Sequence, residues 1–246
     1  MNAKTKDETE GFVSLSQMTR AVQEFEHLIR EGMIEGLPPY LAKIFLNSLM
    51  GVEIRYQSML EIKGLIELGI RDGLTGLYNK RFFGEQLRIT LANTSRFMQP
   101  LCLIFVDIDY FKTRVNDQHG HPNGDVVLTE VAKVLGSCLS RGSDILARAG
   151  GEEFGFILPN TSWEKGIKVA ERIRQAVEKK GITLLNNGRI AVTVSVGVAN
   201  FTPGKQGDII PPEELTFQAD VALYNAKLER NQVVSFQQGM SIPETV

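Results

Sequence analysis

Two aspartates, Asp107 and Asp109, end an apolar run, LCLIFV, that has the composition of a buried central strand. Side chains alternate along a strand, so both aspartates point to the same side. Carboxylates at the rim of a core need a cation, and magnesium favours one or two carboxylates together with substrate phosphates. Strand-end aspartates that only cap a neighbouring helix are the alternative, which the pair alone leaves open.

Two glutamates, Glu152 and Glu153, follow a pair of glycines and precede another apolar run. Gly150 and Gly151 predict a two-residue hairpin turn, because glycine adopts positive φ freely and lets a ligand approach the backbone. The glutamates should then face opposite sides of their strand and have different roles. The apolar residues that follow argue against an exposed hairpin. If the hairpin tip lies beside the strand-end aspartates, the carboxylates form a site typical of metal-dependent phosphoryl transfer.

Strands and helices alternate from residue 72 onward and must position these carboxylates. Periodicity predicts strands at 101–109, 145–149, 152–159, 189–200 and 233–236, and helices at 124–139, 162–181 and 212–231. This order predicts an α/β sandwich in which helices cover a sheet.

The segment 1–71 has a different pattern. Apolar residues at helical spacing from Leu15 to Ile29 predict one helix, which ends at Gly36-Leu37-Pro38-Pro39. A longer helix follows with a heptad seam from Phe45 to Ile70 and surplus apolar residues beside it. We interpret the segment as a dimerising helical stalk, which would also offer a docking surface to a regulatory protein. A helical hairpin packed on its own domain is the alternative.

The composition excludes several classes of protein. A net charge of -2 over 246 residues gives no basis for general binding to nucleic acid or to a membrane surface. The sequence contains no apolar run of about 18 residues, so it predicts no membrane span. The polar start of the chain does not resemble a signal peptide, and Cys102 and Cys138 are expected to be buried thiols. We therefore expect a cytoplasmic protein.

A set of ordered motifs resembles the GGDEF-domain family of diguanylate cyclases, here in the GGEEF spelling. The motifs are DGLTGLYNKR (72–81), VDIDYFK (106–112), NDQHGHPNGD (116–125), RGSD (141–144), RAGGEEF (148–154), SVGVA (195–199) and ADVALYNAK (219–227). The resemblance implies a palm-like nucleotidyl-cyclase sandwich over 72–240, with a mostly antiparallel central sheet flanked by helices, after a helical hairpin or coiled-coil segment at 1–71. It implies condensation of two GTP into cyclic di-GMP with release of two pyrophosphates, by a homodimer with two Mg²⁺ or Mn²⁺ ions per active site.

The resemblance also implies a role for individual residues. Glu152 resembles the essential acid, which binds metal and deprotonates the ribose 3′-hydroxyl. The implied metal ligands are Asp107, the Ile108 carbonyl, Glu152 and Glu153. The implied GTP site comprises Asn116 and Asp125 at the guanine, Lys227 and Arg230 at the triphosphate, and Phe111, Lys112, His121, Gly150 and Gly151. Arg141, Asp144 and Arg172 resemble an inhibitory site for the product, which predicts feedback inhibition.

Two departures from the family pattern affect the nucleotide pocket. Three residues, Thr113 to Val115, separate FK from ND where the pattern has two. The pattern AKxxGRN is replaced by AKLERN, one residue shorter and without glycine, which displaces Arg230 relative to Lys227. These changes mean either weaker GTP binding or loop variation. Two other functions stay open: an inactive cyclic di-GMP receptor, and a cyclase with a different dinucleotide product.

Overall fold

The computed structural model describes residues 20, 23–24, 27, 51 and 67–242 of the chain. The chain divides into two compact units, Met1–Gly69 and Ile70–Val246. The helices predicted before residue 67 lie outside the described residues, apart from the few positions named. In the described part of the chain, no helix combines the length and the apolar character needed to cross a bilayer.

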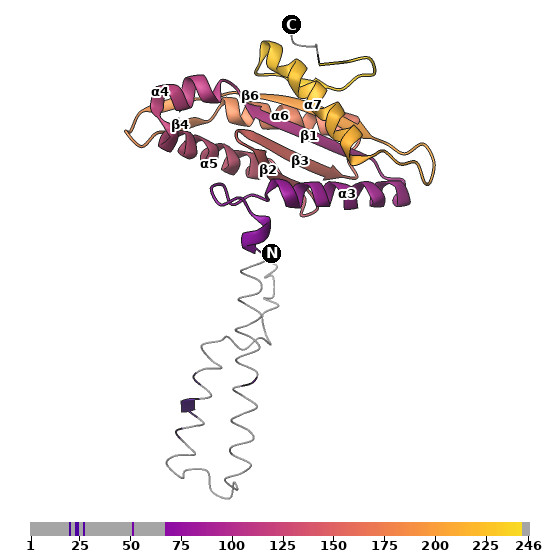
Figure 1. Ribbon diagram of the computed structural model, residues 1–246, viewed down its shortest axis with the longest axis horizontal. Coiled ribbons are helices and arrows are strands. Elements are labelled where there is room, and N and C mark those ends of the chain that lie inside the picture. Colours follow the sequence, from indigo (N-terminus) through magenta and orange to yellow (C-terminus); the bar gives the residue numbers. More distant parts are fainter. Residues whose placement is uncertain (1–19, 21–22, 25–26, 28–50, 52–66, 243–246) are drawn as a thin grey trace, which may run out of the picture. The chain divides into compact units, whose positions relative to one another are not determined.

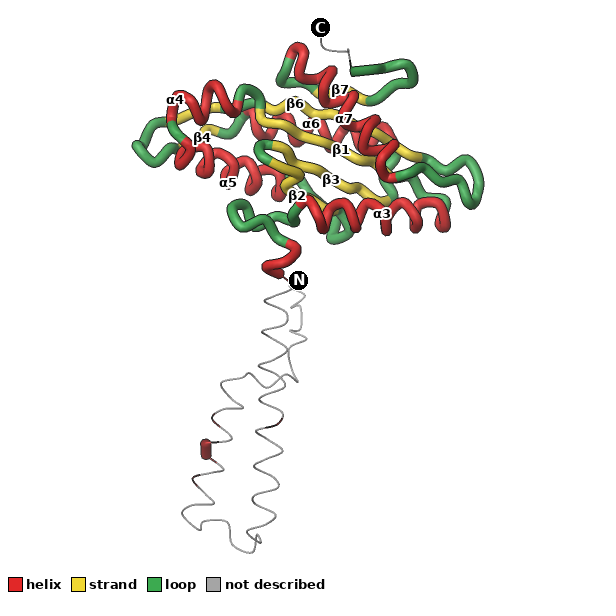
Figure 2. The backbone as a smooth tube through the Cα atoms, in the orientation of Figure 1, coloured by secondary structure: helices red, strands yellow, loops and turns green. Residues whose placement is uncertain are grey.

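A five-stranded sheet forms the centre of the second unit, in the order β2-β3-β1-β6-β7 (Figures 1 and 2). The central strand β1 is buried along its whole length and pairs antiparallel with β3 on one side and β6 on the other. Only β7 joins its neighbour in parallel. The strands are β1 (Leu101–Ile108), β2 (Ile145–Gly150), β3 (Glu153–Pro159), β6 (Val194–Phe201) and β7 (Val233–Ser235). The predicted mostly antiparallel sheet is confirmed.

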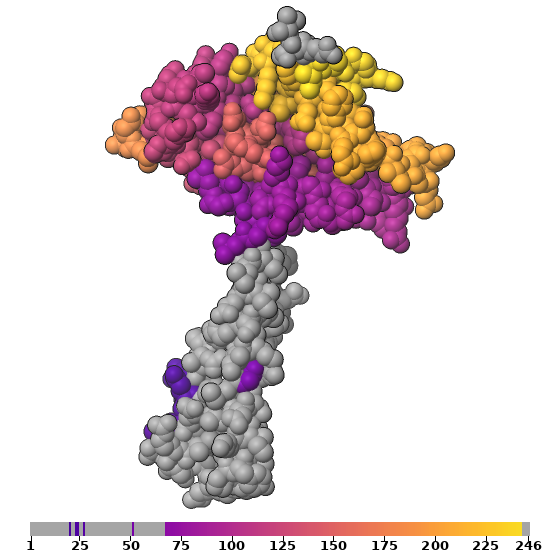
Figure 3. Space-filling view, viewed as in Figure 1, coloured from indigo at the N-terminus to yellow at the C-terminus, as the bar shows by residue number. Residues whose placement is uncertain are grey.

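Helices cover both faces of this sheet. One apolar cluster packs α3 (Lys80–Phe97) and α7 (Pro212–Glu229) against one face, and Figure 3 shows both helices on the surface there. A second cluster packs α5 (His121–Ser137) and α6 (Trp163–Glu178) against the other face. Side chains of β1 alternate between the clusters, since Leu101, Leu103 and Phe105 belong to the first and Cys102, Ile104 and Val106 to the second. Asp107 therefore emerges on the side of α7.

The segment predicted as one strand, 189–200, forms two. β5 (Arg189–Ala191) pairs with β4 (Gly181–Thr183) in a separate two-stranded sheet, and only β6 belongs to the main sheet. Thr193, directly before β6, still contacts the residue that follows β1 in the main sheet. Its carbonyl accepts from the Asp109 backbone N–H at 2.9 Å, and its hydroxyl donates to Asp109 Oδ2 at 2.7 Å. Alternation of β-branched residues continues through this point, so the sequence pattern does not reveal the break.

The hairpin turn lies one residue later than predicted. Gly150 pairs with Glu153, so the two loop residues are Gly151 and Glu152 rather than the two glycines. The cause is an irregularity between Arg148 and Gly150 that shifts the register of β2 against β3. Gly151 has a φ of 42°, which explains the requirement for glycine at that position.

A π-helix absorbs the extra residue before Asn116. It spans Phe111–Asn116, directly after Tyr110, and continues into the short α4 (Asp117–His119). A π-helical turn contains more residues than an α-helical turn, so the insertion is accommodated without extending a loop. The N-terminal boundary of α5 also differs from the prediction, since the helix already begins at His121.

Candidate functional site

A cavity of about 440 Å³ lies where β1, the β2–β3 hairpin and the end of α7 meet. Its lining contains the two kinds of group that a metal-bound triphosphate requires, carboxylates and cations. The lining residues are Asp107, Ile108, Tyr110, Phe111, Lys112, Thr113, Glu152, Lys227 and Arg230. Most of the residues predicted for the metal and for the phosphates are therefore brought together in one place.

Asp107 is the buried acid of this cavity. Its pKa is raised to about 6, mainly by burial; Glu152 and Glu153 also raise it, and Lys227 opposes the rise. The Lys227 ammonium lies 2.7 Å from Asp107 Oδ2 and partly compensates the buried charge. A carboxylate in this environment has a strong requirement for a positive partner.

The two adjacent glutamates face different cavities, as the sequence predicted. Glu152 lines the cavity beside Asp107. Glu153 lies opposite Asp107 in the β1–β3 ladder but lines a second cavity of about 150 Å³, together with Lys80 and Asp220. Burial raises the pKa of Asp220, and Glu153 raises it further. Lys80 and Asp220 were not predicted as site residues, although both lie within the quoted motifs.

The donor set of the larger cavity fits a hard divalent cation. Within the described part of the chain, no three His, Cys, Asp or Glu side chains are grouped in a way that could hold a metal alone. Magnesium does not require such a group, because it commonly uses one or two carboxylates and takes its remaining ligands from phosphates and water. Asp107 and Glu152 provide these carboxylates, and Asp107 is buried with a raised pKa.

Asn116 is the last residue of the π-helix and lies against α5. Its side chain fills the space that a Cβ on Gly124 would need, and the buried Phe111 ring lies beside the same point. Asp125, the next residue of α5, is exposed, as is His121 at the start of that helix. The absence of a side chain at Gly124 therefore sets the position of Asn116, a role that the sequence analysis did not identify.

Arg148 ties the hairpin loop to the beginning of the domain. Its Nε donates to the Gly151 carbonyl at 2.8 Å, and its Nη1 lies 3.2 Å from Asp72 Oδ1. Asp72 also accepts from the backbone N–H and the hydroxyl of Thr75. Burial raises the pKa of Asp72, but the hydrogen bonds from Thr75 and the Arg148 guanidinium hold it below its ordinary value. Both residues lie in quoted motifs, and only their proximity in space reveals the connection.

Arg230 follows the last residue of α7 in an unusual backbone conformation. Its φ is 63° and its ψ is 172°, a region that is almost restricted to glycine. The arginine thus occupies the conformation for which the missing glycine would be suited. Its guanidinium lies 3.7 Å from the centre of the Tyr110 ring, at the rim of the larger cavity. Although the pattern is one residue short, Arg230 and Lys227 still line the same cavity.

The residues predicted for product inhibition lie close together on the other side of the fold. The pKa of Asp144 is raised by burial and lowered by the charges of Arg141 and Arg172. Its Oδ1 is buried and has no hydrogen-bond partner among the described residues. The two arginines contact the backbone nearby, Arg172 at the Cys138 carbonyl and Arg141 at the Asn160 carbonyl. A buried acceptor without a donor, between two cations, fits a ligand that carries N–H groups and phosphate.

The chain is similar to known proteins in both sequence and structure. A family model described as diguanylate cyclase, GGDEF domain, matches residues 70–232. Diguanylate cyclase A of Treponema denticola is 34% identical over 234 residues, which are 94% of this chain and 57% of that protein. The chain spans about half the length of the curated relatives it matches.

Two solved structures extend the similarity beyond the domain itself. The coiled coil and GGDEF domain of DgcB from Caulobacter crescentus, in complex with c-di-GMP, matches with a TM-score of 0.68 and 32% identity, over 79% of this chain and 98% of that one. Diguanylate cyclase SiaD from Pseudomonas aeruginosa, in complex with its activator SiaC, matches with a TM-score of 0.64 and 33% identity, over 90% and 84% of the two chains. These matches confirm the predicted fold.

Proposed function

We propose the function of this chain from one premise: it belongs to the GGDEF-domain family of diguanylate cyclases. The chain condenses two GTP into cyclic di-GMP and releases two pyrophosphates. The observation that carries this proposal is the single cavity in which Asp107, Glu152, Lys227 and Arg230 lie together at the end of β1. Carboxylates and cations at that position suit a metal-bound triphosphate whose α-phosphorus is attacked by a hydroxyl.

The charged side chains of the cavity, together with Asn116, Asp125 and Glu153 outside its lining, have distinct tasks in this reaction. Glu152 accepts the proton of the ribose 3′-hydroxyl, while Asn116 and Asp125 hold the guanine, whose N–H groups a carboxylate can accept. Lys227 and Arg230 neutralise the triphosphate and the departing pyrophosphate. Asp107, the Ile108 carbonyl and Glu152, supported by Glu153, would hold Mg²⁺ or Mn²⁺. Such a cation neutralises phosphate charge and aligns the attack.

The reaction needs two copies of the chain. One domain binds one GTP, so two domains must face each other, and we assign the pairing to the segment 1–71 preceding a catalytic domain at 72–240. The match to SiaD, a diguanylate cyclase solved with its activator, covers 90% of this chain and supports a regulatory partner, whose docking site we assign to the same segment. Such a partner would act by favouring the productive dimer.

Feedback inhibition is the third part of the proposal. Arg141, Asp144 and Arg172 form a site for cyclic di-GMP, in which the arginines contact phosphate and guanine and Asp144 accepts from a guanine N–H group. The unpartnered Oδ1 of Asp144 supports this assignment, as do the solved relatives that contain c-di-GMP.

The test is incubation of the purified full chain with GTP and Mg²⁺, with cyclic di-GMP and pyrophosphate measured together. We expect both products in a 1:2 ratio, and no product from Glu152→Gln. Wild-type protein that forms no product but binds cyclic di-GMP tightly would instead identify a receptor. Formation of a different dinucleotide would show that the guanine contacts are wrongly assigned.

A further inference from the structure

The turn that carries Arg230 must be held by its surroundings. A residue with a side chain adopts the backbone conformation of Arg230 only where neighbouring contacts enforce it. The next residue, Asn231, also has a positive φ, of 46°. The contacts of Asn231 therefore help to hold the turn from which the Arg230 side chain extends.

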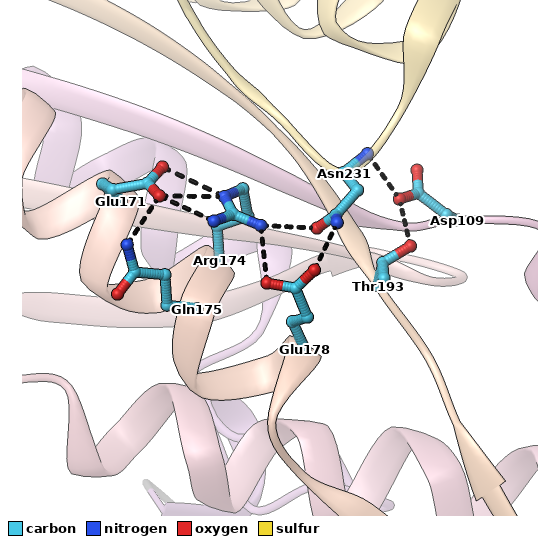
Figure 4. A network of polar contacts seen from close by, with 7 residues as sticks. All are labelled: Asp109, Glu171, Arg174, Gln175, Glu178, Thr193 and Asn231. Carbon is cyan, nitrogen blue, oxygen red and sulfur yellow. Dashed lines mark hydrogen bonds and ion pairs between the residues drawn. The ribbon is translucent and has the colours of Figure 1, made fainter.

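Asn231 is held at its backbone and at both ends of its side-chain amide (Figure 4). Its backbone N–H donates to Asp109 Oδ2 at 3.0 Å. Its Oδ1 accepts from Arg174 Nη1 at 2.8 Å, and its Nδ2 donates to Glu178 Oε1 at 2.7 Å. Asp109 is itself fixed, because it also accepts from Thr193 and from Ser195. The turn after α7 is thus connected both to the end of β1 and to α6.

Arg174 is the centre of this network. Its side chain is 14% exposed and forms ion pairs with Glu171 at 2.7 Å and with Glu178 at 2.9 Å. The hydrogen bonds that Arg174 donates to Glu171 and to Glu178 raise the pKa of Arg174 further above its already high ordinary value. Figure 4 shows the Arg174 guanidinium between Glu171, Glu178 and Asn231. Arg174 does not line the cavity of about 440 Å³ beside Asp107, which we call the phosphate cavity. Arg174 can therefore influence that cavity only through another residue.

We propose that Arg174 is a positioning residue for triphosphate binding, which acts by holding Asn231 and thereby fixing the turn that presents Arg230. The inference rests on the proposed function, because it takes the triphosphate as the ligand of Arg230. The competing explanation is that the network only attaches β7 to α6. In that case the loss of Arg174 would change stability but would not single out the phosphates.

The test is a double-mutant cycle, read by calorimetric binding of two nucleotides in the presence of Mg²⁺. The α,β-methylene analogue of GTP occupies both the guanine and the phosphate contacts, whereas GMP lacks the terminal phosphates. The variants are Arg174→Ala, Arg230→Ala and the double variant. Lys168→Ala, which removes an exposed cation from the same helix, is the matched control. Thermal melting of each variant shows that the protein compared is folded.

We expect Arg230→Ala to weaken binding of the GTP analogue at least tenfold, as for a lost charge-assisted hydrogen bond. Arg174→Ala should weaken it about three- to tenfold, leave GMP binding unchanged and have no further effect in the Arg230→Ala background. Asn231→Ala keeps the Arg174 ion pairs and should weaken binding of the GTP analogue to the same extent as Arg174→Ala. It replaces Arg174→Ala in the experiment if that variant does not fold. The control should bind both nucleotides like wild type.

Two outcomes overturn the inference while leaving the proposed function intact. One is equal weakening of GMP and analogue binding by Arg174→Ala or Asn231→Ala. The other is an undiminished effect of these substitutions in the Arg230→Ala background. A wild-type chain that binds the analogue no better than GMP would instead refute the phosphate assignment of the cavity, and the inference with it.

Discussion

Substitution of Gly124 by alanine should damage guanine recognition while leaving the fold intact. A Cβ at this position would collide with Asn116 Oδ1 and would lie 3.3 Å from both Asn116 Cγ and Phe111 Cζ. Phe111 is buried in the core and cannot yield, whereas the amide of Asn116 is the end of a side chain that can rotate. The substitution should therefore move Asn116 away from the guanine.

The stability terms of this substitution nearly cancel. Alanine is favoured over glycine inside a helix by about 0.5–1 kcal/mol. Forcing Asn116 from its preferred rotamer costs about 0.5–1.5 kcal/mol. We therefore expect the melting temperature of Gly124→Ala to lie within about 4 °C of the wild-type value.

The loss of one neutral hydrogen bond to guanine has a larger effect on catalysis. Such a bond contributes about 0.5–1.5 kcal/mol, so the KM for GTP should rise about 2- to 12-fold. The assay is steady-state formation of cyclic di-GMP at varied GTP concentration, with melting followed in parallel. Because Glu152 and the phosphate cavity are untouched, kcat should change less than KM.

Gly136 offers a matched control in the same helix, because a Cβ there has nothing within 4 Å. Gly136→Ala should leave the KM for GTP at the wild-type value. In an Asn116→Ala background, Gly124→Ala should have no further effect on KM. An unchanged KM in the single variant, or an effect that persists in full without Asn116, would refute the reasoning.

Other predictions concern charged residues. Burial raises the Asp107 pKa from 3.8 to about 6, so this carboxyl favours the folded chain below about pH 4 and loses that contribution as the pH rises through 6. Protons compete with metal, so titration with Mn²⁺ should show about tenfold weaker binding at pH 5 than at pH 7; equal affinities would contradict the assignment. Arg148→Ala leaves Asp72 without its ion pair and should lower the free energy of unfolding by about 1–3 kcal/mol in denaturant titration. Arg141→Ala should raise the cyclic di-GMP level at steady state, and unchanged inhibition by added product would disprove the inhibitory site.

The sequence predicts the candidate site correctly where a motif coincides with the side-chain alternation of a strand. The apolar run before Asp107 specifies a central strand, and its alternation places Asp107 on the side of α7, from which Lys227 reaches it at 2.7 Å. The prediction that Glu152 and Glu153 point in different directions agrees with the two cavities that they line, although Glu152 lies in the hairpin loop and only Glu153 lies on β3. These features depend on local pattern, which a single sequence displays.

Features that depend on contacts between distant residues are not visible in the sequence. The hairpin turn is shifted by an irregularity in β2 that no glycine pattern indicates. The hydrogen bond between Thr193, directly before β6, and Asp109 spans 84 positions. The ion pair of Arg148 with Asp72 spans 76 positions. These two long-range contacts form only when the sheet has assembled.

The two departures from the family pattern meet at one residue, Tyr110. The extra residue lies in the π-helix that begins directly after it and that carries Arg114, whose guanidinium is 4.3 Å from the centre of the Tyr110 ring. The shortened end of α7 places the Arg230 guanidinium 3.7 Å from the same centre. Tyr110 lines two cavities. One is the phosphate cavity, which Arg230 also lines, and the other is a separate cavity, which Arg114 also lines.

A ring that contacts two cations in this way gains cation–π stabilisation from each of them. The longer segment and the shorter one are thus both held against the same tyrosine. Asn116 remains against α5, and Arg230 remains beside Lys227 at the phosphate cavity. This geometry favours loop variation over weakened GTP binding as the meaning of the departures, since the cations that a triphosphate needs still line its cavity.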